Sequence, residues 1–161
     1  MGFNGLLKAN FLGPGPYEKK VKYRWELSET LSFTWEGTDE EYEILKEMGL
    51  TKTKNLRSRK VKGVRNITLS CAKGFITDLA SIPRGAWVVI SPWDIARAAV
   101  IHDLLYQTLR KVEVEDWKKS RKVCDDIFKN AMQSVDPAVA GWKVAACYNS
   151  VRMFGGFTFN K

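Results

Sequence analysis

The spacing of apolar residues changes halfway along this chain of 161 residues. Apolar and polar side chains alternate over residues 17–37, and the apolar positions are Val21, Tyr23, Trp25, Leu27, Leu31, Phe33 and Trp35. A period of two is typical of strands with one buried face. We therefore expect two strands here, joined through residues 28–30 as a hairpin or meander, and a third alternating strand from Val64 to Leu69.

The second half of the chain has helical spacing instead. Ser91-Pro92-Trp93-Asp94 places a capping serine and a proline at a helix start, which predicts a first helix from Pro92 to Arg110. A second helix is expected from Asp116 to Ser134, and a third from Asp136-Pro137 to Gly155-Gly156. Strands followed by helices predict an α+β protein with N-terminal antiparallel strands and a three-helix C-terminal part.

The chain is expected to form a single domain over residues 1–161, because it contains no linker, repeat or low-complexity tract. Its strand-rich part covers residues 1–75 and its helical part residues 91–155. Within the strand-rich part, residues 38–62 combine a short helix with a basic segment. The helix is predicted over Asp39 to Met48, with Thr38 or Asp39 as its cap and Gly49 as its end. Residues 12–16 are rich in glycine and proline and are interpreted as an N-terminal loop.

The formal net charge is +8, and much of the excess is local. The basic segment contains Lys52, Lys54, Arg57, Arg59, Lys60, Lys62 and Arg65 with no acidic residue among them. Such a cluster attracts nucleic acid, anionic lipid or an acidic protein, or it is simply a solvated loop and charged strand edge. No aromatic residue interleaves the cluster to stack on bases, so we favour the solvated edge over nucleic acid.

The sequence indicates no export or membrane insertion. The N-terminus lacks the basic and continuous apolar regions of a signal peptide, and no apolar stretch approaches the roughly 18 residues of a transmembrane helix. The three cysteines, Cys71, Cys124 and Cys147, are odd in number and lack metal-site spacing. This favours reduced, buried thiols over disulfides or zinc.

His102 is the only histidine, and it lies in the apolar run Ile101-His102-Asp103-Leu104-Leu105-Tyr106. Tyr106 is four residues further on and shares a helix face with His102. If the first two helices are antiparallel neighbours, Asp125 faces His102 across them, as a carboxylate that orients a catalytic base would. Asp103 offers oxygen ligands to calcium. Alternatively, the same polar groups pin two helices together without catalysis.

A second group of polar residues lies in the stretch from Gly74 to Arg84, which we interpret as an irregular loop. Asp78 and Arg84 are candidates to pair with each other, or Arg84 binds an anionic substrate. Ser81 lacks the surroundings of a nucleophilic serine and is expected to bond the backbone.

Three runs make the chain similar to a known family: GFITDLASIPR, AAVIHDLLY and SRKVCDDIFKNAM. They resemble Domain of Unknown Function family 1353, whose members are encoded mainly by bacteriophages and prophages. The resemblance covers residues 64–155 well and residues 20–37 weakly. Relative to the usual length of the family, residues 38–62 look like an insertion. The positions that match the family pattern are Asp78, Ser81, Pro83, Arg84, His102, Asp103, Tyr106, Arg121 and Asp125.

The runs HDLLY and CDDIF are also similar to the paired helices of phospholipases A₂. This resemblance implies that His102 activates water, Asp125 orients His102, Tyr106 bonds Asp125 and Asp103 binds calcium. Unlike the secreted enzymes, the chain lacks a disulfide framework and a glycine-rich calcium loop just before the first helix.

These resemblances lead to two main hypotheses about function, and a third possibility is a small phage accessory factor that acts on a host protein or nucleic acid. In the first, a virion-associated phage protein hydrolyses ester or amide bonds of host envelope lipid or peptidoglycan. In the second, it is a non-catalytic tail, baseplate or connector component that contacts other virion proteins. Either would place the protein in the virion or the host cytoplasm. A hydrolase predicts that His102, Asp103 and Asp125 converge on an open cleft, and a His102 sealed by apolar neighbours with no cavity beside it would contradict catalysis. The structural role predicts that the basic segment or the aromatic residues 157–159 lie against other subunits.

Overall fold

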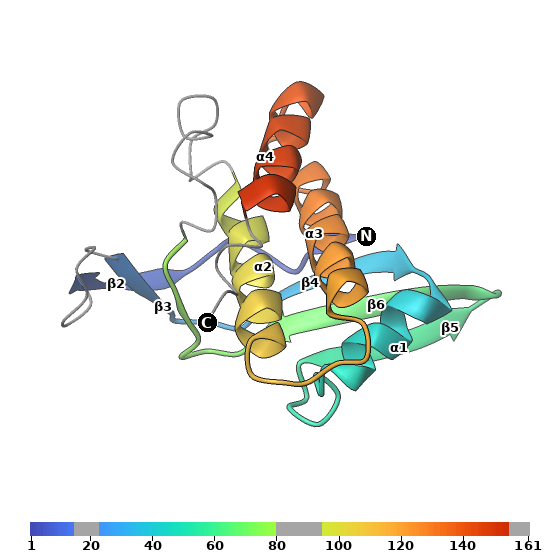
Figure 1. Ribbon diagram of the computed structural model, residues 1–161. Coiled ribbons are helices and arrows are strands. Elements are labelled where there is room, and N and C mark those ends of the chain that lie inside the picture. The colour runs from blue at the N-terminus through green and yellow to red at the C-terminus, as the bar shows by residue number, and fades with distance from the viewer. Residues whose placement is uncertain (15–22, 80–94, 155–161) are drawn as a thin grey trace.

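The computed structural model describes residues 1–14, 23–79 and 95–154. In chain order the elements are β1 (Gly2–Phe3), β2 (Ala9–Pro14), β3 (Tyr23–Leu27), β4 (Leu31–Gly37), α1 (Asp39–Glu47), β5 (Leu56–Val61), β6 (Val64–Cys71), β7 (Ile76–Thr77), α2 (Ala96–Leu109), α3 (Trp117–Gln133) and α4 (Gly141–Phe154). The strands form two antiparallel sheets, ordered β1-β4-β6-β5 and β2-β3-β7. The protein is α+β, with the three helices α2, α3 and α4 in its C-terminal part (Figure 1).

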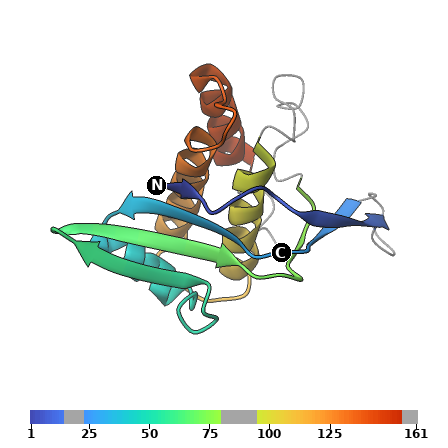
Figure 2. The same cartoon turned by 180° about the vertical axis from the view of Figure 1, so that it is seen from behind.

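The four-stranded sheet carries its helices on one face, as the two opposite views show (Figures 1 and 2). The inward residues Phe33, Ile67 and Leu69 are buried on that face. Helix α2 packs between the sheet and α3, and it is buried on nearly every side, including Ile101 and Leu105. This central position explains why α2 is apolar around most of its circumference, and it makes any polar residue on α2 notable.

The expected hairpin between residues 17 and 37 is wrong. β3 and β4 are consecutive strands, but β3 pairs with β2 and β7, whereas β4 pairs with β1 and β6. Where the chain leaves β3 and passes to the other sheet, the Leu27 N–H donates to Phe75 O and the Ser28 N–H donates to Lys8 O. Alternation identifies the buried face of a strand but not its neighbour, so the sequence could not reveal this change of sheet.

Two further expectations are corrected at the N-terminus and before α4. Residues 12–14 belong to strand β2, where Gly13 has φ of 83° at a shift in register, so the glycine marks a bulge rather than a loop. α4 begins at Gly141, five residues after Asp136. Pro137 therefore precedes the helix instead of starting it.

Other expectations are confirmed. Thr38 caps α1 and forms a reciprocal capping box with Glu41. α2 is described from Ala96, so its predicted cap at Ser91-Pro92 lies outside the described residues. The basic segment contributes β5, the edge strand of the larger sheet, and the three cysteines are free and buried. In the described residues, no helix is both long and apolar enough to cross a membrane.

Candidate functional site

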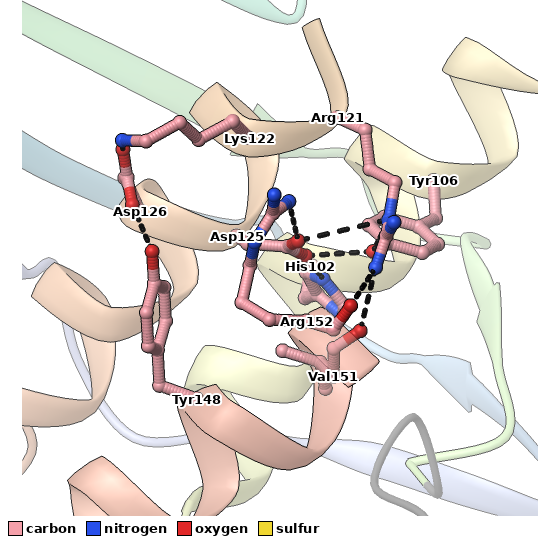
Figure 3. A network of polar contacts seen from close by, with 9 residues as sticks. All are labelled: His102, Tyr106, Arg121, Lys122, Asp125, Asp126, Tyr148, Val151 and Arg152. Atoms are coloured by element: carbon pink, nitrogen blue, oxygen red, sulfur yellow. Dashed lines mark hydrogen bonds and ion pairs between the residues drawn. The ribbon is translucent and has the colours of Figure 1, made fainter. Parts of the chain in front are cut away.

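Asp125 of α3 is the centre of a buried polar network that joins three helices (Figure 3). From α2, His102 Nε2 lies 3.0 Å from Asp125 Oδ1 and the Tyr106 hydroxyl donates to the same oxygen at 2.6 Å. From α4, Arg152 donates to Oδ2 at 2.7 Å. Arg121 Nε of α3 lies 3.8 Å from Oδ2. Each carboxylate oxygen thus faces groups that stabilise negative charge.

Burial and hydrogen bonding act in opposite directions on Asp125. Burial raises the pKa of a carboxyl group, but hydrogen bonds from His102, Tyr106 and Arg152 together hold the pKa of Asp125 below its usual range. Burial and the neighbouring Asp125 carboxylate also raise the pKa of Tyr106, so its hydroxyl stays protonated. The tyrosine is therefore a donor to an ionised carboxylate, which is a strong kind of hydrogen bond.

Of the two ring nitrogens of His102, only Nε2 is hydrogen-bonded to a described residue. Its side chain is 2% exposed, and its ring lies 4.1 Å from the ring of Tyr106 and 4.5 Å from that of Phe128. Because the ionised Asp125 only accepts, Nε2 is the nitrogen that donates. Within the described part of the chain, the buried Nδ1 has no hydrogen-bond partner. A buried polar atom without a partner costs about 1–3 kcal/mol, so Nδ1 calls for an explanation.

The two arginines connect the network to the end of α4. Arg121 donates to the carbonyl oxygens of Val151 at 2.9 Å and of Arg152 at 2.6 Å, which satisfies carbonyls of the last turn of α4. The 32%-exposed Arg152 side chain links Asp125 to the surface. Sequence reasoning missed Arg152. A basic residue in the last turn of a helix is a general feature, and nothing in the sequence indicated that it reaches Asp125.

Asp103 faces a different element from His102. The Thr77 hydroxyl of β7 donates to Asp103 Oδ2, and Asp103 is also hydrogen-bonded to the backbone and side chain of Asp78. Burial and the charge of Asp78 raise the pKa of Asp103 to about 8. Leu79, which follows Asp78 in the chain, has φ of 53°, a conformation that a non-glycine residue seldom adopts. Asp103 and Asp78 thus form a separate acidic pair at the end of β7.

The structure brings together four of the predicted site residues, His102, Tyr106, Arg121 and Asp125. Asp78 pairs with Asp103 rather than with this network. Ser81, Pro83 and Arg84 lie outside the described residues.

Oxygen atoms dominate the acidic pair, as a hard cation such as calcium prefers. Thr77 adds a hydroxyl to the two carboxyl groups. Among residues 1–14, 23–79 and 95–154, no group of three or more His, Cys, Asp or Glu side chains is placed to hold a metal ion. The oxygen donors of Asp103, Asp78 and Thr77 are thus of a type that suits calcium. Only two of them, the carboxyl groups of Asp103 and Asp78, can carry a charge.

Fold and site together define an α+β protein built around a buried His–Asp–Tyr–Arg network. The model of the family described as "Protein of unknown function (DUF1353)" matches residues 42–151, and the chain belongs to this family. The match begins within α1 and includes β5, so most of the supposed insertion lies inside the matched range. Arg152 falls one residue beyond it. Neither the curated proteins nor the solved structures contain a match to the chain.

Proposed function

We propose that the protein is a virion-associated bacteriophage protein whose His102–Asp125 pair hydrolyses an ester or amide bond of the host envelope. One observation carries the catalytic part: Nε2 of His102 is bound to an ionised carboxylate while Nδ1 has no partner among the described residues. A purely structural histidine would gain by satisfying both nitrogens. The proposed phage origin and virion association rest on the resemblance of the three sequence runs described above.

The geometry supports a general-base mechanism. Asp125 accepts the Nε2 proton and fixes the tautomer in which Nδ1 carries a lone pair. Nδ1 takes a proton from water as the water oxygen bonds to the carbonyl carbon of the substrate. The Nδ1 proton then passes to the leaving oxygen or nitrogen as the ester or amide bond breaks. Tyr106 and Arg152 hold the Asp125 carboxylate in place throughout.

The burial of His102 sets a condition on this mechanism. A side chain that is 2% exposed does not meet a substrate directly, so water and the reacting bond reach Nδ1 only after the surrounding side chains move apart. Without such a movement the sealed ring would contradict catalysis, and it fits the alternative hypothesis. In that alternative, the protein is a structural virion component and the Asp125 network holds α2, α3 and α4 together.

Calcium is part of the proposal at Asp103. Asp103 and Asp78 would hold the ion through their carboxylates, and calcium bound there would supply positive charge that polarises a substrate carbonyl or phosphoryl group. At neutral pH the pair retains a proton in the absence of a cation, because the pKa of Asp103 is raised to about 8. Binding of calcium is therefore expected to release this proton.

The test is a screen of purified protein against phospholipid vesicles and peptidoglycan, with and without calcium. We expect hydrolysis that His102→Ala and Asp125→Asn abolish and that Tyr148→Phe retains. Tyr148 of α4 is a suitable control because its hydroxyl bonds Asp126 of α3, outside the His102 network. Folding of each variant is checked by circular dichroism, and added imidazole should partly restore His102→Ala if the lost group is a base.

Absence of hydrolysis from every substrate, together with the protein's presence in purified virions, would favour the structural alternative. Activity that folded His102→Ala retains in full would contradict the proposed role of His102. A protein that is missing from virions would contradict virion association in both hypotheses.

A further inference from the structure

Within the basic segment, the arginines and lysines of β5 and β6 separate into two sets on opposite faces of the larger sheet, while Lys52 and Lys54 precede β5. The pairing of β5 with β6 shows which side chains lie on each face of the sheet. Leu56 pairs with Leu69 and Ser58 pairs with Ile67, so these positions lie on the face that packs against the core. Side chains alternate along a strand, so Arg57 and Arg59 point away from the core. Lys60 and Arg65, which pair with each other across the strands, point toward α1.

Only the inward set is neutralised by an acidic residue. Asp39 of α1 binds both inward cations, with Lys60 Nζ 2.7 Å from Oδ2 and Arg65 Nε 2.5 Å from Oδ1. Arg65 also donates to the Ser58 hydroxyl and covers the ring of Tyr42. In the described part of the chain, Arg57, Arg59 and Lys62 form no ion pair with an acidic side chain, and all three are exposed. The sequence presents one basic cluster, whereas the structure pairs Lys60 and Arg65 with Asp39 and leaves the outer row of the β5–β6 hairpin without an ion pair among the described residues.

No described element covers the outer face of the sheet, and this face is polar; it also carries the exposed Glu36, which pairs with Asn66 from β4. Figure 2 shows the green strands β5 and β6 in front of the helices. Thr68 and Asn66 stand opposite Arg57 and Arg59, and Thr34 bonds Thr68 from the neighbouring strand at 2.9 Å. Each hydroxyl retains hydrogen-bonding capacity beyond that contact. Arg57 and Arg59 are about 6.8 Å apart along β5. The exposed Lys62 lies in the turn between β5 and β6, close in sequence to this row.

We propose that this outer face of the β5–β6 hairpin binds the phosphate backbone of double-stranded nucleic acid without reading its sequence. A line of uncompensated cations along one strand fits a linear polyanion, and the adjacent hydroxyl and amide groups fit phosphate and sugar oxygens. No aromatic side chain lies in the row, which disfavours the stacked bases of a single strand. A membrane surface would require more apolar side chains than Val61 and Val64 at the hairpin tip.

Binding is tested by fluorescence anisotropy with a labelled DNA duplex of arbitrary sequence. Three phosphate contacts predict that log K falls with log salt with a slope of about −2.7 between about 50 and 200 mM salt. Arg57→Gln with Arg59→Gln should reduce the magnitude of that slope by about 1.8. The matched control is Lys8→Gln with Lys60→Gln, which removes the same formal charge from two exposed lysines already paired with Glu29 and Asp39.

The inference holds if the arginine variant loses affinity and the lysine control does not, with equal melting temperatures. Equal losses in both variants would overturn it, because general attraction by net charge would then suffice. Absence of saturable duplex binding at about 50 mM salt would overturn it as well. Binding to phosphatidylglycerol vesicles that depends on Arg57 and Arg59, with weaker binding to the duplex, would assign the face to lipid instead. None of these outcomes depends on hydrolysis by the His102 site.

Discussion

Asp125 and Asp39 each form ion pairs with two lysine or arginine side chains, but they do so in opposite surroundings. Asp125 is completely buried between three helices, whereas the Asp39 side chain is 61% exposed. Both carboxyl groups have a lowered pKa. For Asp39 the leading cause is the hydrogen bond from Lys60, while for Asp125 hydrogen bonds must first overcome burial. Similar contacts therefore have different consequences, because water screens the Asp39 pairs and not the Asp125 network.

The difference indicates where function and stability depend on precise geometry. Removing one partner from a buried network leaves the others without compensation, whereas exposed ion pairs are replaced by water at little cost. The following predictions test this contrast, from the largest expected effect to the smallest.

Asp125→Asn should have the largest effect. The substitution leaves Arg121 and Arg152 without their buried counter-charge, and we expect the free energy of unfolding to fall by about 3–5 kcal/mol. Urea denaturation monitored by circular dichroism measures it. The neighbouring Asp126→Asn is the control, since Asp126 contacts Tyr148 and Lys122 in a more exposed position and should change stability far less. Equal effects of the two substitutions would refute the contrast.

The second prediction concerns pH and Asp103. Its folded-state pKa is raised to about 8, while the unfolded value is near 3.8, so the folded protein binds an extra proton between these limits. This group therefore favours folding most strongly below about pH 4, and its contribution is lost as pH rises to 8. Asp103→Asn should flatten the decline in urea midpoint across this range. A decline that is unchanged in the variant would show that another group causes it.

The sign is reversed for Asp125. Because its pKa is lowered, its contribution is complete above about pH 4 and is lost only as pH falls through the folded-state pKa. Unfolding as pH falls below about 4 should therefore depend on Asp125, and the loss of stability as pH rises from about 4 to 8 should depend on Asp103.

Tyr106→Phe should cost less than Asp125→Asn. It removes one hydrogen bond to an ionised carboxylate, and about 1.5–3 kcal/mol of stability is expected to be lost. Tyr148→Phe is the matched substitution, because its hydroxyl donates at the same 2.6 Å distance to the more exposed Asp126. In thermal unfolding, Tyr106→Phe should have a lower melting temperature than Tyr148→Phe. The opposite ranking would mean that burial does not strengthen the Asp125 network.

Asp39→Asn should have the smallest effect, with no measurable change in the urea midpoint, because Lys60 and Asp39 are both exposed to water. Added salt screens the Asp39 ion pairs, and this screening should likewise leave the urea midpoint of the wild-type protein unchanged. A marked loss of stability would indicate that the Asp39 pairs hold β5 in place.

The sequence predicted the four-residue core of the site because local rules apply there. Spacing of four residues aligns His102 with Tyr106 on α2, and a short connection makes α2 and α3 antiparallel neighbours, so Asp125 was within reach. Arg152 could not be predicted, since its contact depends on how α4 crosses α3. The separation of Asp103 from His102 depends on β7, a strand of two residues too short to show a period.

The fold shows the same division between local and distant information. The capping box of α1 uses residues three apart and was predictable. The separation of β3 from β4 is determined by pairing with β2, β7, β1 and β6, which lie elsewhere in the chain. Strand pairing over long sequence distances leaves little trace in the alternation of a single strand.

The central claim is that Asp125 holds the Nε2 proton of His102 and leaves Nδ1 with a lone pair. Long-range ¹H–¹⁵N correlation spectra of ¹⁵N-labelled protein test it directly, and the spectrum is unambiguous because the chain has one histidine. At pH 8 we predict a protonated Nε2 and a bare Nδ1, with this pattern lost in Asp125→Asn. A protonated Nδ1 at that pH, with or without a proton on Nε2, would contradict the account.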